Sequence, residues 1–78
     1  MERNLGNVYS VLKVLLTGEM RFTDLLALSI PRIGSSASAE KAINLSLELG
    51  FTERRKRGLY ILTESGRKLI EALEVAPS

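Results

Sequence analysis

The chain has 78 residues, of which 45% are apolar, and 11 basic and 9 acidic side chains give a net charge of +2. A chain of this length supports one hydrophobic core, so we expect a single domain over residues 1–78. Cysteine and histidine are both absent, which excludes disulfides, thiolate nucleophiles and the usual zinc ligands and removes the commonest general base near neutral pH. We therefore expect no enzyme, and predict no catalytic residue, no metal site and no cofactor.

No apolar stretch approaches the ~20 residues that a membrane-spanning helix requires, and no secretory signal opens the chain. We expect a cytoplasmic protein without membrane contact. Its charge is unevenly distributed: residues 1–50 carry five basic and five acidic side chains, whereas residues 51–78 carry six basic and four acidic. The excess positive charge is therefore local.

Apolar residues recur every three or four positions over residues 4–16, which predicts a first helix that stops near residues 17–18. The expected members of its buried stripe are Leu5, Val8, Tyr9, Leu12, Leu15 and Leu16. Residues 20–22 are too few to form a sheet alone, and we expect them to form a brief strand before the second helix.

The second helix is expected to begin at Thr23, whose hydroxyl can accept a backbone N–H of the first turn, with Asp24 adding negative charge at the positive helix end. Pro31 is expected to end it, because proline lacks a donor and disfavours helical geometry in the residue before it. The apolar face of this helix is predicted to consist of Leu25, Leu26, Leu28 and Ile30.

Residues 32–36 are expected to form a turn, after which a serine caps a third helix that runs to about Leu49 and stops at a left-handed Gly50. The candidate caps are Ser35, Ser36 and Ser38. The predicted inward stripe is Ala39, Ala42, Ile43, Ser46 and Leu49, and the predicted outer face is Ser35, Ser38, Lys41, Asn44 and Leu45. The outer face thus carries short, mostly uncharged groups.

Four consecutive cations, residues 54–57, separate the short apolar runs 50–52 and 58–62, which predicts a β-hairpin with a basic tip. Thr63 is then expected to cap a fourth helix, with Gly66 allowing close backbone packing. Leu69, Ile70 and Leu73 are predicted to face inward, and residues 75–78 to form a tail.

This order of elements is that of a winged helix-turn-helix domain, and three strings resemble HxlR-like and related archaeal and bacterial regulators. The size of the chain and its lack of a ligand domain also resemble the small stand-alone winged proteins of archaea and their viruses and plasmids. Residues 20–26 (MRFTDLL) resemble the opening of the family's second helix, and residues 47–51 (LELGF) resemble the exit from its recognition helix. Residues 60–69 (YILTESGRKL) resemble its passage from wing to last helix and are the most specific match. The similarity covers roughly residues 18–74. It implies an α+β, mainly α fold with a three-helix core, a short β-hairpin wing and a C-terminal fourth helix.

The resemblance implies a transcription regulator that binds specific double-stranded DNA and acts by occupying its operator, with residues 36–49 as the recognition helix in the major groove. The family's basic residue in this helix falls on Lys41, and Asn44 has the amide that can pair with adenine. Residues 54–57 would contact the DNA backbone or minor groove. The full predicted set of DNA contacts is Arg32, Ser35, Ser36, Ser38, Lys41, Asn44, Arg54, Arg55, Lys56 and Arg57.

Several alternatives remain open at this point. The same fold serves as a protein-interaction module in larger assemblies, the cations could be a solvated loop, and the serines could act only as caps. Leu45 and Leu47 together could mark a partner surface. Monomer and homodimer are both left open, with the first or the C-terminal helix as the dimer contact, and no small-molecule ligand is evident. Operator, target genes and the choice between activation and repression are not specified by these patterns.

Overall fold

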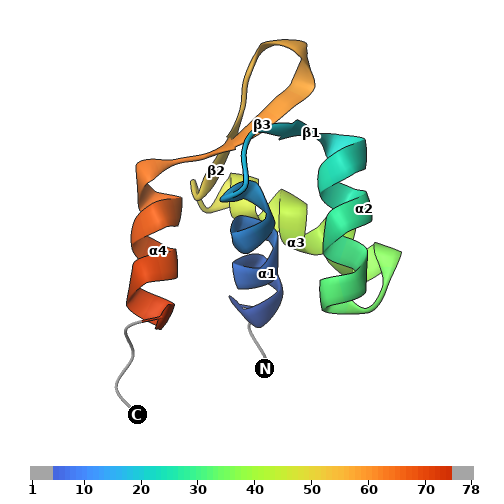
Figure 1. The fold of residues 1–78 in the computed structure, drawn as a ribbon, viewed down its shortest axis with the longest axis horizontal. Helices are drawn as coiled ribbons and strands as arrows, with labels where there is room; N and C mark the ends of the chain where they lie inside the picture. Colours follow the sequence, from blue (N-terminus) through green and yellow to red (C-terminus); the bar gives the residue numbers. More distant parts are fainter. Residues whose placement is uncertain (1–4, 75–78) are drawn as a thin grey trace.

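The computed structural model describes residues 5–74 and is mainly helical, with four α-helices and a three-stranded sheet in this part of the chain (Figure 1). The α+β class predicted from the sequence is therefore confirmed. The tail predicted over residues 75–78 lies outside the described residues. The elements in chain order are α1 (Leu5–Leu15), β1 (Met20–Arg21), α2 (Phe22–Ile33), α3 (Ser36–Glu48), β2 (Thr52–Arg54), the 3-10 turn η1 (Lys56–Gly58), β3 (Leu59–Leu62) and α4 (Glu64–Glu74).

The sheet is antiparallel with strand order β1-β3-β2. Met20 lies opposite Tyr60, and Glu53 lies opposite Ile61, so the brief first strand extends the hairpin formed by β2 and β3. The predicted strand at residues 20–22 is confirmed for its first two positions. Tyr60 is buried at the centre of the sheet and its ring lies 6.0 Å from that of Phe22, which fastens the hairpin base to the start of α2.

Helix α1 is enclosed on several sides, because it packs against α2, α3 and α4 (Figure 1). Its buried arc is therefore wider than the single stripe predicted, and includes Val11 and Val14. The prediction was wrong at both ends of the stripe: Leu5 is 42% exposed and Leu16 is 43% exposed.

Helix α2 begins at Phe22, and its capping position is two residues before the predicted one, since the chain passes directly from β1 into the helix. Arg21 occupies the capping position with extended backbone and makes no side-chain capping bond, so the prediction that Thr23 caps this helix was wrong. Asp24 does lie in the first turn, as predicted. Leu28 is 53% exposed, not part of the buried face.

Pro31 does not end α2, contrary to prediction, and the helix continues to Ile33. A proline in the last turn disrupts only the bond to the carbonyl four residues earlier, and Ile33 packs against the main core, which favours the extra turn. The helix ends instead at Gly34, whose backbone has φ +112° and whose N–H donates to the Ile30 carbonyl over 2.7 Å. Glycine adopts this left-handed conformation without a steric penalty.

Helix α3 is capped by Ser35, one of the three candidate serines, and ends at Gly50 as predicted. The Ser35 hydroxyl accepts the Ser38 N–H over 3.1 Å at the start. At the end, Gly50 has φ +83°, its N–H donates to Leu47, and the Phe51 N–H donates to Ser46, which is the full Schellman pattern of bonds.

The small inward face of α3 is confirmed for four residues, with Leu49 as the error. Ala39, Ala42, Ile43 and Ser46 are buried. Leu49 is 49% exposed because it follows the last helical residue. Leu47 packs partly against the main core and Leu45 partly against the second cluster, and both are half-buried.

The core consists of two adjoining clusters on either side of α1. The main cluster lies between α1, α2, α3 and β3, and the second joins α1 to α4 through Val8, Leu12 and Ile70. Leu69 is partly buried there, whereas Leu73, predicted to face inward, is 40% exposed near the end of α4. In the part of the chain that the structure describes, none of the helices combines the length and apolar character needed to cross a membrane.

The base of the hairpin, the end of α3 and the start of α4 meet at Thr63 and Gly66. The Thr63 hydroxyl donates to the Gly50 carbonyl over 2.7 Å and accepts the Gly66 N–H over 3.1 Å, which confirms Thr63 as the cap of α4. Gly66 is buried against the Phe51 carbonyl, and an added Cβ would also lie 2.8 Å from Leu62 Cδ1. The predicted close packing at Gly66 is therefore confirmed.

Ser29 is completely buried in α2, and its hydroxyl makes no hydrogen bond among the described residues. A buried hydroxyl without a partner loses its hydration without compensation. We expect Ser29→Ala to raise the free energy of unfolding by about 1 kcal/mol in urea titrations. Ser46→Ala is the matched control: it removes a buried hydroxyl that is bonded, and should lower stability. Equal destabilisation by both variants would contradict this account of Ser29.

Candidate nucleic-acid interface

The predicted contacts at the start of α3 gather around a two-residue connection from α2. Arg32 is exposed in the last turn of α2, and Ser35 and Ser36 are exposed at the positive end of α3. Ser38 is only partly exposed, and its N–H is bonded to the Ser35 hydroxyl. The Ser35 oxygen is thus already used as a cap, while its O–H can still donate to an anion.

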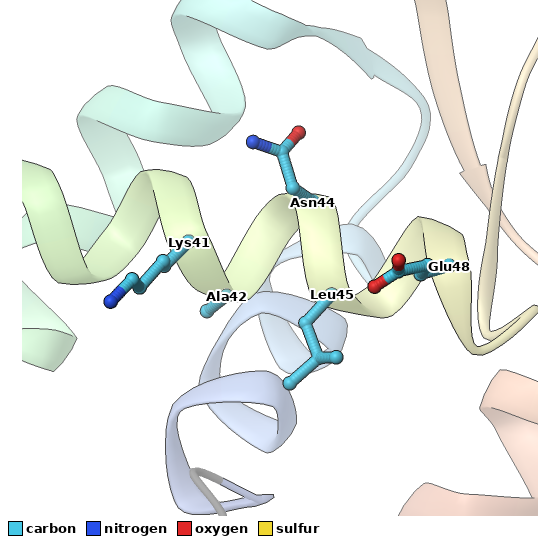
Figure 2. A pocket seen from close by; sticks show the side chains of 5 residues that line it. All are labelled: Lys41, Ala42, Asn44, Leu45 and Glu48. Carbon is cyan, nitrogen blue, oxygen red and sulfur yellow. The ribbon is translucent and has the colours of Figure 1, made fainter.

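The outer face of α3 is free of any covering segment among the described residues, and it presents Lys41 and Asn44 to solvent. Figure 2 shows these two side chains on the exposed side of the helix, together with Glu48 one turn further on. The three residues border a shallow depression of about 300 Å³ whose floor includes Ala42 and Leu45. Leu45, predicted to lie on this outer face, is half-buried at its edge.

Glu48 was missed in the sequence interpretation. The available signal was its spacing, because it follows Asn44 by four positions and Lys41 by seven, which places all three on one helical face. Phosphate contacts require cations or hydroxyls, so a carboxylate is not among the residues expected to make them.

The four hairpin cations lie at the hairpin tip, as the sequence predicted: Arg54 ends β2, and the other three follow before β3. Figure 1 shows this loop extending beyond the helices. All four residues of the segment 54–57 are exposed, and none forms an ion pair with any residue within 5–74. Their positive charge is therefore available to an external anion.

The hairpin tip has an unusual backbone. Arg57 and Gly58 have φ values of +65° and +70°, and the Leu59 N–H donates to the Lys56 carbonyl. Two successive left-handed residues are typical of tight hairpin turns that favour Asn-Gly. A residue with a side chain is strained in this left-handed conformation, so Arg57 lowers the stability of the turn while it places a guanidinium at the tip.

A buried pair of hydroxyls joins α3 to the hairpin. Ser46 Oγ donates to the Ile43 carbonyl over 2.7 Å and lies 3.1 Å from Thr52 Oγ1, and both residues are buried. Because the Ser46 proton is used in the first bond, Thr52 must be the donor in the second. This bond fixes the first residue of β2 against the last turns of α3.

A second polar cluster lies on α1 and α4, at the end of α4 away from the hairpin. Glu74 Oε2 accepts from the Tyr9 hydroxyl over 2.8 Å and from Lys13 Nζ over 2.6 Å. The hydrogen bond from Lys13 lowers the pKa of the Glu74 carboxyl, and the hydrogen bonds to Glu74 raise the pKa of Tyr9 and of Lys13. The pKa shifts follow from the ion pair and the hydrogen bond that join the end of α4 to α1.

No protein-family model matches this chain, and no curated protein matches it. Within residues 5–74 no group of three or more acidic side chains is placed to hold a metal ion. The two features that stand out are the uncovered face of α3 and the basic hairpin that follows it.

Proposed function

We propose that this protein is a winged helix-turn-helix protein that binds specific double-stranded DNA and regulates transcription by occupying an operator. The observation that carries the proposal is that an exposed hairpin, whose four cations form no ion pair within residues 5–74, follows a helix whose polar face no other described segment covers. The helices α2 and α3 would form the helix-turn-helix, and β2 and β3 would form the wing.

Helix α3 has the dimensions for the major groove, since a helix with its side chains is about 10–12 Å across and the groove is about 12 Å wide. In this arrangement Ser35 and Ser36 would hold a phosphate at the positive end of the helix. Lys41 would reach a guanine edge, and the Asn44 amide would make the paired contact with adenine. Arg32 would contact the backbone beside this segment.

The wing would supply attraction that does not depend on sequence. Its four cations lie on a loop that extends from the body (Figure 1), and such groups bind phosphates and set the register of the protein on the duplex. The Ser46–Thr52 bond holds the wing and the recognition helix in one relative orientation, which both contacts require if they are to form together.

Salt dependence tests the proposal. If about five cations per protomer each neutralise a phosphate, log K for a random duplex should fall against log salt with a slope of about −4 to −5, and about twice that for a dimer. Fluorescence anisotropy with a labelled duplex, together with the mass of the complex in solution, measures both quantities. Absence of binding at moderate salt would contradict DNA binding and would favour the protein-interaction alternative.

A further inference from the structure

Glu48 is a carboxylate on the exposed face of α3 that is proposed to contact bases, and it is not among the predicted DNA contacts. It is exposed, and it borders the same depression as Lys41 and Asn44 (Figure 2). At 1.5 Å per residue, Glu48 lies about 6 Å along the helix axis from Asn44, which corresponds to roughly two base-pair steps. The three side chains therefore form a row of cation, amide and carboxylate.

The position of Glu48 is unfavourable for the protein alone. It is the last residue of α3, where the helix end carries partial negative charge, and the last turn of α3 contains no basic residue. Glu48 forms no ion pair with any residue that the structure describes. On a surface that only held phosphates, a carboxylate would also repel the ligand.

A carboxylate does have a partner among base edges. In the major groove cytosine presents its N4 amino group as a donor, and glutamate accepts from it. Guanine and thymine offer acceptors that would repel a carboxylate at the same place, and adenine has an N7 acceptor beside its N6 amino group that would repel the second carboxylate oxygen. We propose that Glu48 determines specificity, by accepting a hydrogen bond from a cytosine amino group about two steps from the base pair that Asn44 contacts. This inference rests on the proposed DNA binding.

The experiment begins with selection of bound fragments from a random duplex pool by the wild-type protein and by Glu48→Ala. The wild-type sites should contain one C·G pair whose replacement by T·A lowers affinity about 5- to 100-fold, whereas the variant should lose less than twofold at that position. Glu48→Ala should also bind random duplex DNA more tightly, because one charge that repels phosphates is gone. Glu71→Ala is the matched control, since it removes an exposed carboxylate from α4.

The outcomes separate the inference from the function. If the wild-type protein binds no duplex, DNA binding itself fails. If the wild-type protein selects a site and Glu48→Ala keeps every base preference, DNA binding stands and the role of Glu48 is overturned. The role of Glu48 is also overturned if Glu71→Ala tightens binding to random duplex DNA as much as Glu48→Ala does.

Discussion

Replacing all four hairpin cations, Arg54, Arg55, Lys56 and Arg57, with glutamine is expected to lower affinity for random duplex DNA about a thousandfold at 0.1 M salt. Each cation that neutralises a phosphate releases about 0.9 counterions, so the slope of log K against log salt should change from about −4.5 to about −1. Titrations of a labelled duplex at several salt concentrations measure both the affinity and the slope. The loss should be similar for all sequences, because these residues would contact backbone and not base edges.

The fold should survive this change, since all four side chains are exposed and form no ion pair with the rest of the described chain. Arg67→Gln with Lys68→Gln provides a control that removes positive charge from the exposed surface of α4. This control should alter the salt slope much less than two of the hairpin cations do. If the two sets of substitutions weakened binding equally per charge, the binding site would not be the hairpin.

The second large effect is expected at Gly66, where alanine should lower the free energy of unfolding by about 3 kcal/mol. The added methyl group would collide with the backbone carbonyl of Phe51, which cannot rotate away as a flexible side chain could. Relief would require α4 to move from the hairpin base, which would weaken the Thr63 cap and the contacts of Ile70. A domain of this size is stable by about 4–12 kcal/mol, so the loss is a substantial part of the total.

Urea denaturation measures this effect, and Gly6→Ala is its control. Gly6 also lies in a helix, but nothing is within 4 Å of a Cβ built there. Alanine has the higher helix propensity, so Gly6→Ala should leave stability unchanged or raise it by up to about 1 kcal/mol. Equal responses at Gly6 and Gly66 would show that the close packing of α4 on the Phe51 carbonyl is not what stabilises the fold.

The features predictable from the sequence are those decided within a few residues. Gly50 and Thr63 are predictable, and the cap of α3 is narrowed to three serines that include Ser35, because caps and left-handed stops act on the backbone beside them. Pro31 misled the prediction because packing of Ile33 on the core outweighed a local penalty. Leu5 and Leu73 were predicted to be buried but are exposed for a similar reason. Periodicity indicates which face of a helix is apolar, but not how far along that face a neighbouring helix extends.

The candidate site was predictable in part. The exposed cations at the hairpin tip follow from four charges between two apolar runs, and the structure places them there. The left-handed backbone of Arg57 has no sequence signal apart from the following Gly58. The Ser46–Thr52 bond joins a helix to a strand, and local sequence patterns do not indicate contacts between elements. Glu48 is negatively charged, whereas the residues predicted to contact DNA are cations, hydroxyls and an amide. DNA binding itself stays a prediction.

The Thr63 hydroxyl has a consequence for how the molecule opens. It bonds to the Gly50 carbonyl at the end of α3 and to the Gly66 N–H in the first turn of α4. Because one hydroxyl makes both bonds, unfolding of the end of α3 or of the start of α4 disturbs the other. We therefore expect the amide protons of the two segments to exchange together, as one cooperative unit. The hairpin tip is held by bonds of its own, since the Arg55 N–H donates to the Leu59 carbonyl over 2.7 Å, so its opening need not follow that of the two helix ends.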